Sequence, residues 1–136
     1  MNRLFAILVA VCLAAFAASC GGDGPTTPTE TRIISLSGDM TYGDVEVGQS
    51  ANRTLRISNV GNAVLTINSI TMSTEIVDGF ATSLASSTTI QPSASIDVLL
   101  IFRPLQARQY LGLGNVQGNM TSGTNSFSVS GTGVVK

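Results

Sequence analysis

Ile96-Asp97-Val98-Leu99-Leu100-Ile101-Phe102 is the stretch that decides the fold. Every second residue from Ile96 to Phe102 is apolar, so in an extended chain these residues lie on one face and fill a core. Leu99 and Ile101 occupy the opposite face. Apolar residues on both faces predict a strand that is central and covered on both sides, or one that presents an apolar patch to a partner.

Similar short runs of β-forming residues recur on both sides of this stretch, with turn residues between them. Gly43 to Gln49 predicts a bend followed by a short edge segment. The other expected strands cover Ile33–Leu36 continued by Met40–Tyr42, then residues 51–59, 63–72, 80–84, 96–102, 110–116 and 126–130. The sequence therefore predicts about seven strands.

Two local features refine this prediction. Val60-Gly61-Asn62 predicts a tight hairpin turn, because Gly and Asn tolerate a positive φ. In the strand that follows, the apolar positions change parity between Ile67 and Ile70. A bulge or bend near Asn68-Ser69 would keep both sets of apolar side chains in the core.

After the N-terminal segment, no window of helical length keeps an apolar stripe with a 3.6-residue period. The chain has 14 Gly, only 11% charged residues and abundant Ser, Thr, Asn and Val, a composition typical of β proteins. We therefore expect an all-β, antiparallel β-sandwich over residues 32–136, built from two sheets packed face to face.

The N-terminus has the features of an export signal. Arg3 precedes an apolar run from Leu4 to Phe16, and Ala17-Ala18-Ser19 stands before Cys20. This pattern resembles the lipobox of bacterial lipoproteins, although leucine is commoner at the position of Ala17. The resemblance implies a signal peptide over residues 1–19 and a diacylglyceryl group on Cys20.

Two alternatives to the lipobox are a transmembrane helix and an ordinary secretory signal. The apolar run is shorter than the roughly 20 residues that a membrane span needs. An ordinary signal stays open, but residues 21–30 (GGDGPTTPTE) lack core-forming side chains and read as a flexible tether over residues 20–31. We expect a tethered domain that is anchored to the membrane through Cys20.

The composition excludes several classes of function. Cleavage before Cys20 would remove 19 of 136 residues and one of the 7 basic residues, and the remaining chain would carry a net charge of about −2. This charge gives no reason to expect nucleic-acid binding. The sequence has no His, and its two cysteines are Cys12 and Cys20. We expect no disulfide, no cofactor, no metal site and no catalytic residues in the domain.

The possible metal or catalytic groups are isolated, and a structural role explains each of them better. Three methionines could bind copper (Met40, Met72, Met120), and three carboxylates near a bend could bind Ca²⁺ (Asp39, Asp44, Glu46). The carboxylates Glu75 and Asp78 could act as a pair in glycosidic bond hydrolysis.

Four motifs stand in a familiar order: residues 42–49 (YGDVEVGQ), 54–62 (TLRISNVGN), 102–104 (FRP) and 127–133 (FSVSGTG). Together they resemble the immunoglobulin-like (Ig-like) domains of the ASH and major-sperm-protein type, including the bacterial choice-of-anchor D repeats. The resemblance covers residues 33–135 and implies a scaffold or binding module. In physical terms, Pro104 would end the central strand, and Gly131 and Gly133 would let the last strand leave the sheet.

We therefore expect a non-enzymatic envelope lipoprotein that binds a protein through a sheet edge or through Leu99 and Ile101. A carbohydrate-binding or adhesive module is the first alternative, and a hydrolase or metal-binding protein is the last. Gly21, rather than Asp, follows Cys20. In a host with two membranes, we expect the outer one. The sequence does not indicate an oligomeric state.

Overall fold

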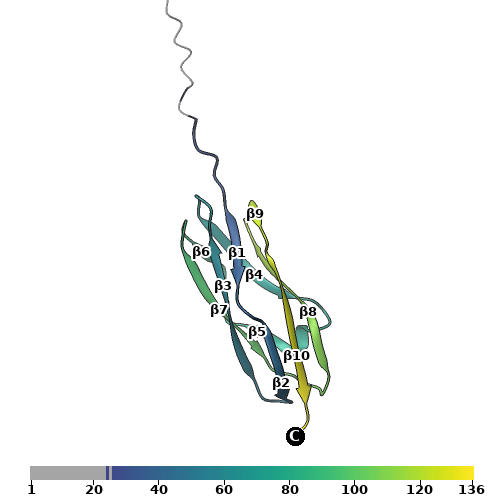
Figure 1. Ribbon diagram of the computed structural model, residues 1–136. Helices are drawn as coiled ribbons and strands as arrows, with labels where there is room; N and C mark the ends of the chain where they lie inside the picture. The colour runs from purple at the N-terminus through teal and green to yellow at the C-terminus, as the bar shows by residue number, and fades with distance from the viewer. Residues whose placement is uncertain (1–23, 25) are drawn as a thin grey trace, which may run out of the picture.

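The computed structural model describes Gly24 and residues 26–136, which form a β-sandwich below an extended N-terminal segment (Figure 1). The segment predicted to be a signal peptide, Cys20 and the first residues of the predicted tether lie outside the described residues. One 3-10 turn, η1 (Val77–Gly79), is present. The strands are β1 (Ile33–Ser37), β2 (Thr41–Glu46), β3 (Ala51–Asn59), β4 (Leu65–Met72), β5 (Phe80–Thr82), β6 (Thr88–Ile90), β7 (Ser95–Phe102), β8 (Gln109–Gly118), β9 (Ser122–Gly123) and β10 (Ser126–Val134).

The strands form two five-stranded sheets, in the orders β5-β7-β3-β1-β9 and β2-β10-β8-β4-β6. Ten strands exceed the predicted seven, because β6 and β9 have only three and two residues. In addition, the first predicted strand divides into β1 and β2, which lie in different sheets. Gly38, with a φ of 133°, stands where the chain crosses between them.

The predicted β-sandwich is confirmed, with one addition. Most neighbouring strands are antiparallel, but β1 pairs with β9 and β10 pairs with β2 in parallel. The predicted bulge is also confirmed, because the register between β4 and β8 shifts between Ile67 and Ser69. Ile67 and Ile70 are both buried as a result.

The hairpin predicted at Val60-Gly61-Asn62 is wrong. β3 and β4 belong to different sheets, so this turn carries the chain across the sandwich. The φ of Gly61 is not positive. Instead, a Cβ atom there would lie 2.2 Å from the Thr31 carbonyl oxygen. The close approach of the segment before β1 therefore explains this glycine.

The role predicted for the last glycines is also wrong. Gly131 and Gly133 lie inside β10, which continues to Val134. A Cβ atom at Gly131 would lie 2.5 Å from the Phe102 ring. A Cβ atom at Gly133 would lie 2.1 Å from the Gln106 carbonyl oxygen. These glycines make room for neighbours in the core and in the β7–β8 loop.

The core lies between the two sheets. The inward side chains of β7 include Val98, Leu100 and Phe102, all at most 3% exposed. Phe102 is the centre of an aromatic cluster, with its ring centroid 4.6 Å from Phe80, 5.3 Å from Tyr42 and 5.2 Å from Tyr110. β7 lies between β5 and β3, one place from the edge of its sheet.

Candidate functional site

The two residues predicted as a partner surface lie on the outer face of the sheet. Leu99 stands opposite Thr54 of β3 and is 43% exposed. Ile101 stands opposite Asn52 on one side and Ala81 of β5 on the other, and is half-buried. In the part of the chain that the structure describes, no second sheet covers this face. The assignment of a partner to it stays a prediction, as does lipid attachment at Cys20.

A shallow hollow extends the apolar surface from Ile101. It has a volume of about 320 Å³, and its lining includes Ile101, Phe80 and Leu105. Leu105 is 57% exposed, and it belongs to the loop between β7 and β8. Phe80 and Leu105 were not predicted as surface residues, because a three-residue strand and a loop give no periodic signal.

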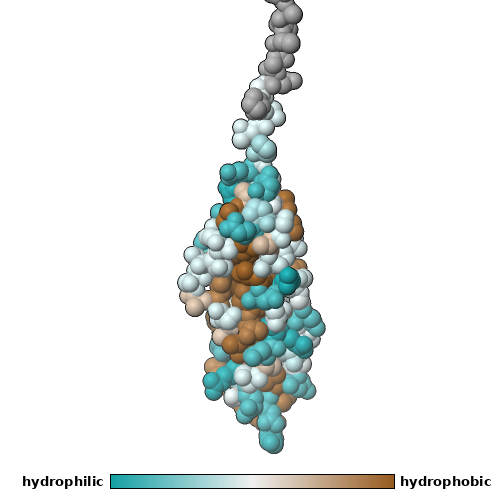
Figure 2. Space-filling model, turned by 90° about the vertical axis from the view of Figure 1, so that its left-hand side faces the viewer, coloured by the Kyte–Doolittle hydropathy of each residue, from teal (hydrophilic) through white to brown (hydrophobic). Residues whose placement is uncertain are grey.

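The outer face of the other sheet carries a second apolar pair. Leu111 and Leu113 of β8 are 56% and 51% exposed, opposite Ser130 and Ser128 of β10. They alternate with buried Tyr110 and Gly114, and this alternation is the sequence signal for their exposed face, although neither leucine was among the predicted surface residues. Figure 2 adds a hydrophobic band along the side of the domain on which β6 and β7 lie. Apolar surface is therefore distributed over several faces.

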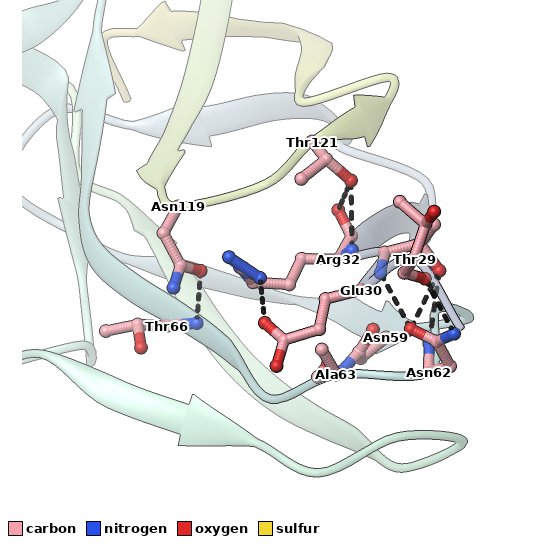
Figure 3. Close-up of polar contacts among 10 residues, drawn as sticks. Thr29, Glu30, Arg32, Asn59, Asn62, Ala63, Thr66, Asn119 and Thr121 are labelled. Atoms are coloured by element: carbon pink, nitrogen blue, oxygen red, sulfur yellow. Dashed lines mark hydrogen bonds and ion pairs between the residues drawn. The ribbon is translucent and has the colours of Figure 1, made fainter. Parts of the chain in front are cut away.

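A polar cluster joins the N-terminal segment to the domain (Figure 3). The Asn62 amide donates to the Thr29 carbonyl oxygen (3.0 Å), and its carbonyl oxygen accepts from the Thr31 N–H (2.6 Å). Arg32 pairs with Glu30 at 3.2 Å, and its main-chain N–H donates to the Thr121 hydroxyl (2.9 Å). These contacts fix the segment from Thr29 onward against the sandwich.

Asn59 supports the same end of the domain from the inside. It is fully buried, and its amide nitrogen donates to the Ala63 and Ile90 carbonyl oxygens at 2.8 and 3.0 Å. Its side-chain carbonyl oxygen accepts from the Gly61 N–H at 3.0 Å, so Asn59 closes the turn that follows it. Asn62, by contrast, binds the N-terminal segment.

Asp39 and Asp78 have structural partners. Asp39 accepts from the Thr41 N–H at 2.9 Å, and hydrogen bonds to Thr41 hold the pKa of its carboxyl below the ordinary value. Asp78 binds Arg108 at 2.8 and 3.0 Å, and this hydrogen bond raises the pKa of the guanidinium. Within Gly24 and residues 26–136, no three His, Cys, Asp or Glu side chains lie close enough to hold a metal ion together.

The part of the chain that the structure describes contains no helix long and apolar enough to span a membrane.

Comparison with protein families gives one clear match. The model of the HYDIN/CFA65/VesB-like, Ig-like domain matches residues 33–132, which is most of the sandwich. No curated protein matches the sequence.

Solved structures share the fold at low identity. The ASH/PapD-like domain 7 of human CEP192 is 16% identical with a TM-score of 0.62, and the match covers 83% of this chain and 93% of that one. A Porphyromonas gingivalis protein of unknown function is 17% identical with a TM-score of 0.61, covering 79% and 50%. The SrpA adhesin of Streptococcus sanguinis is 10% identical with a TM-score of 0.55, covering 80% and 60%.

This chain thus spans about half the length of the Porphyromonas gingivalis protein. The family match and the CEP192 domain confirm the predicted Ig-like domain of the ASH and major-sperm-protein type. At these identities the solved structures establish the fold alone. Ig-like folds of this type are typical of non-catalytic binding domains.

Proposed function

Because the chain belongs to the HYDIN/CFA65/VesB-like Ig-like domain family, we propose that it is a non-enzymatic binding module held at the cell envelope by lipid on Cys20. The apolar segment before Cys20 and the small residues at positions 17–19 support export and lipid attachment. A diacylglyceryl group supplies two acyl chains, which is about what stable anchoring needs. Gly21 after the cysteine favours the outer membrane in a host with two membranes.

The observation that carries the binding role is the apolar surface on the outer face of the β7 sheet. Leu99 is 43% exposed beside the ion pair of Arg56 and Asp97, whose atoms are 3.2 Å apart. Ile101 leads from Leu99 to the hollow lined by Phe80 and Leu105. An apolar centre with a charged rim is the usual composition of a protein–protein interface. The proposed partner is therefore another envelope protein.

The residue types of the domain support a role without catalysis. The sequence has no His, and Cys12 and Cys20 both precede the sandwich. General acid–base and thiol chemistry would therefore lack their commonest groups. The carboxylates Asp39 and Asp78 hold a turn and an ion pair.

The anchor is tested by metabolic labelling with a fatty acid. We expect label on the wild-type protein and none on Cys20→Ser, because the thiol is the acceptor. Equal label on both proteins would refute lipid attachment at Cys20.

The partner surface is tested by cross-linking in living cells. Leu99→Asp should remove the cross-linked species, whereas Leu111→Asp, a matched change on the other sheet, should keep it. Both variants should melt within a few degrees of the wild type, because both side chains are exposed. If only Leu111→Asp removed the cross-linked species, the interface would lie on the β8 face instead. If both variants kept the cross-linked species, neither leucine would be at the centre of the interface.

A further inference from the structure

The edge of the second sheet is only half covered. β10 has nine residues, but β2 pairs with it only from Ser130 onward. Figure 1 shows β2 beside the lower part of β10, while the chain above it has crossed to the other sheet as β1. Residues 126–129 of β10 therefore have no neighbouring strand on this side.

In the described part of the chain, the main-chain groups of this stretch that face away from β8 are unpaired. In the ladder with β8, every second residue forms the hydrogen bonds. The Val116 N–H donates to the Asn125 carbonyl oxygen (2.8 Å), and the Gly133 N–H donates to the Arg108 carbonyl oxygen (2.8 Å). The intervening residues turn the other way, as the bond from the Ser130 N–H to Met40 at 3.1 Å shows. Ser126 and Ser128 have the same parity as Ser130, and among the described residues their N–H and C=O groups have no hydrogen-bond partner.

A cleft of about 310 Å³ lies between this edge and β1. Its floor is apolar, with Leu36, Leu55 and Phe127. Its rim carries hydroxyl side chains and no charged side chain among the described residues. The Ile33 carbonyl accepts from Val60 of the turn after β3 at 2.8 Å, so by parity the N–H and C=O of Leu36 point away from β3 and toward the cleft.

We propose that this cleft, defined by β1 and residues 126–129 of β10 and here called the edge cleft, binds an extended, uncharged segment of the partner protein. The segment adds a strand beside Ser126 and Ser128 and places one apolar side chain over Leu36 and Phe127. This inference rests on the proposed binding function and specifies the partner's binding element. Strand addition to an open edge is a general mode of peptide recognition.

The chemistry of the cleft selects this occupant. Donors and acceptors that repeat every second residue are matched by another extended main chain. Long native edges are usually protected by charged side chains or proline. Residues 126–129, with the sequence SFSV, have neither. Residues 21–30 of this chain, GGDGPTTPTE, offer no apolar side chain for the floor, which favours a segment from another protein.

The test uses the full-length protein in detergent and a displayed library of random heptapeptides. Selected peptides should be uncharged with apolar residues at alternate positions. They should bind the wild type and Ser128→Ala with equal affinity. They should bind Ser128→Pro roughly tenfold more weakly, because proline removes the N–H that the peptide needs. Pro is tolerated at a free edge, and a melting curve checks that the variant is folded.

Amide hydrogen exchange gives a second measurement that does not depend on a variant. Adding a selected peptide to wild type should slow exchange at Ser126 and Ser128. Unchanged exchange there, equal binding to Ser128→Pro, or a library that yields no peptide would overturn the edge cleft as a strand-binding site. Self-association that Ser128→Pro abolishes would also overturn it, by identifying a second copy as the occupant.

Leu99→Asp separates this inference from the proposed function. Leu99 lies on the outer face of the β7 sheet, away from the edge cleft, so this variant should bind the peptides like wild type. If cross-linking in cells depends on Leu99 while peptides bind Ser128→Pro normally, the binding function stands and the strand-binding inference fails.

Discussion

The two ends of the sandwich are held together by different interactions. The end away from the tether contains four aromatic rings from β2, β5, β7 and β8, with Phe102 in contact with the other three. The end next to the tether contains aliphatic side chains, such as Ile57 and Leu65, and one buried polar residue, Asn59. Ring packing therefore stabilises the first end, and aliphatic packing with the hydrogen bonds of Asn59 stabilises the second.

The difference shows how a small domain without a disulfide can close both ends of a β-sandwich. At the aromatic end, both tyrosine hydroxyls also have partners: Tyr42 donates to the Leu100 carbonyl (2.7 Å), and Tyr110 accepts from Leu105 and Gln106 (3.2 Å each). At the tether end, three hydrogen bonds of Asn59 join the turn after β3 to Ile90 of β6. Variants at each end should therefore fail for different physical reasons.

The largest effect is expected for Phe102→Ala. This ring is fully buried, and its removal should cost roughly 3–5 kcal/mol of the free energy of unfolding, because the rings around it cannot fill the cavity. Urea denaturation measures the loss. Leu111→Ala on the outer face serves as the control, with an expected change within about 0.5 kcal/mol. A loss below about 1 kcal/mol at Phe102 would refute the central role of the ring cluster.

Asn59→Ala should have the second-largest effect, about 3 kcal/mol, because it leaves the Ala63 and Ile90 carbonyls without their amide donor. Asn62→Ala is the matched control. Its amide is exposed and holds only the N-terminal segment, so it should cost much less. Equal losses in urea denaturation would show that the tether contacts matter as much as the buried amide.

Gly131→Ala should cost roughly 1–3 kcal/mol, because the new methyl group would lie 2.5 Å from the Phe102 ring. A double-mutant cycle with Phe102→Leu checks the cause, since the smaller side chain gives the methyl group space. We expect the cost of Gly131→Ala to fall in that background. An unchanged cost would mean that the strain arises from another neighbour.

Tyr42→Phe should have the smallest effect, about 0.5–1.5 kcal/mol at neutral pH, through loss of the bond to the Leu100 carbonyl. Burial raises the pKa of the Tyr42 phenol to about 12. In the unfolded chain the pKa is about 10, so this stabilisation is complete below about pH 10 and is lost as the pH rises to about 12. Wild type should therefore lose stability more steeply than Tyr42→Phe over this range. Parallel curves would contradict the buried phenol.

Several local features followed from the sequence. The alternation in Ile96 to Phe102 predicted the inward face of β7, and Val98, Leu100 and Phe102 are buried. The parity change after Ile67 predicted the bulge in β4. Both features depend on the two-residue period of a strand, which neighbouring residues set by themselves. The same alternation placed Leu99 on the outer face, but it does not identify a partner for that face.

Contacts between distant parts of the chain did not follow from the sequence. Position 61 needs glycine because Thr31 lies against it, and position 131 needs glycine because the Phe102 ring lies against it. The chain crosses at Gly38 because β1 and β2 belong to different sheets. The hollow beside Ile101 and the edge cleft likewise arise from elements that meet only in the folded domain. Residue order alone thus determined where the longer strands lie and which way their side chains alternate. Only the tertiary structure decided which strands pair, which edges stay open and why particular glycines are needed, because these depend on packing between residues far apart in the chain.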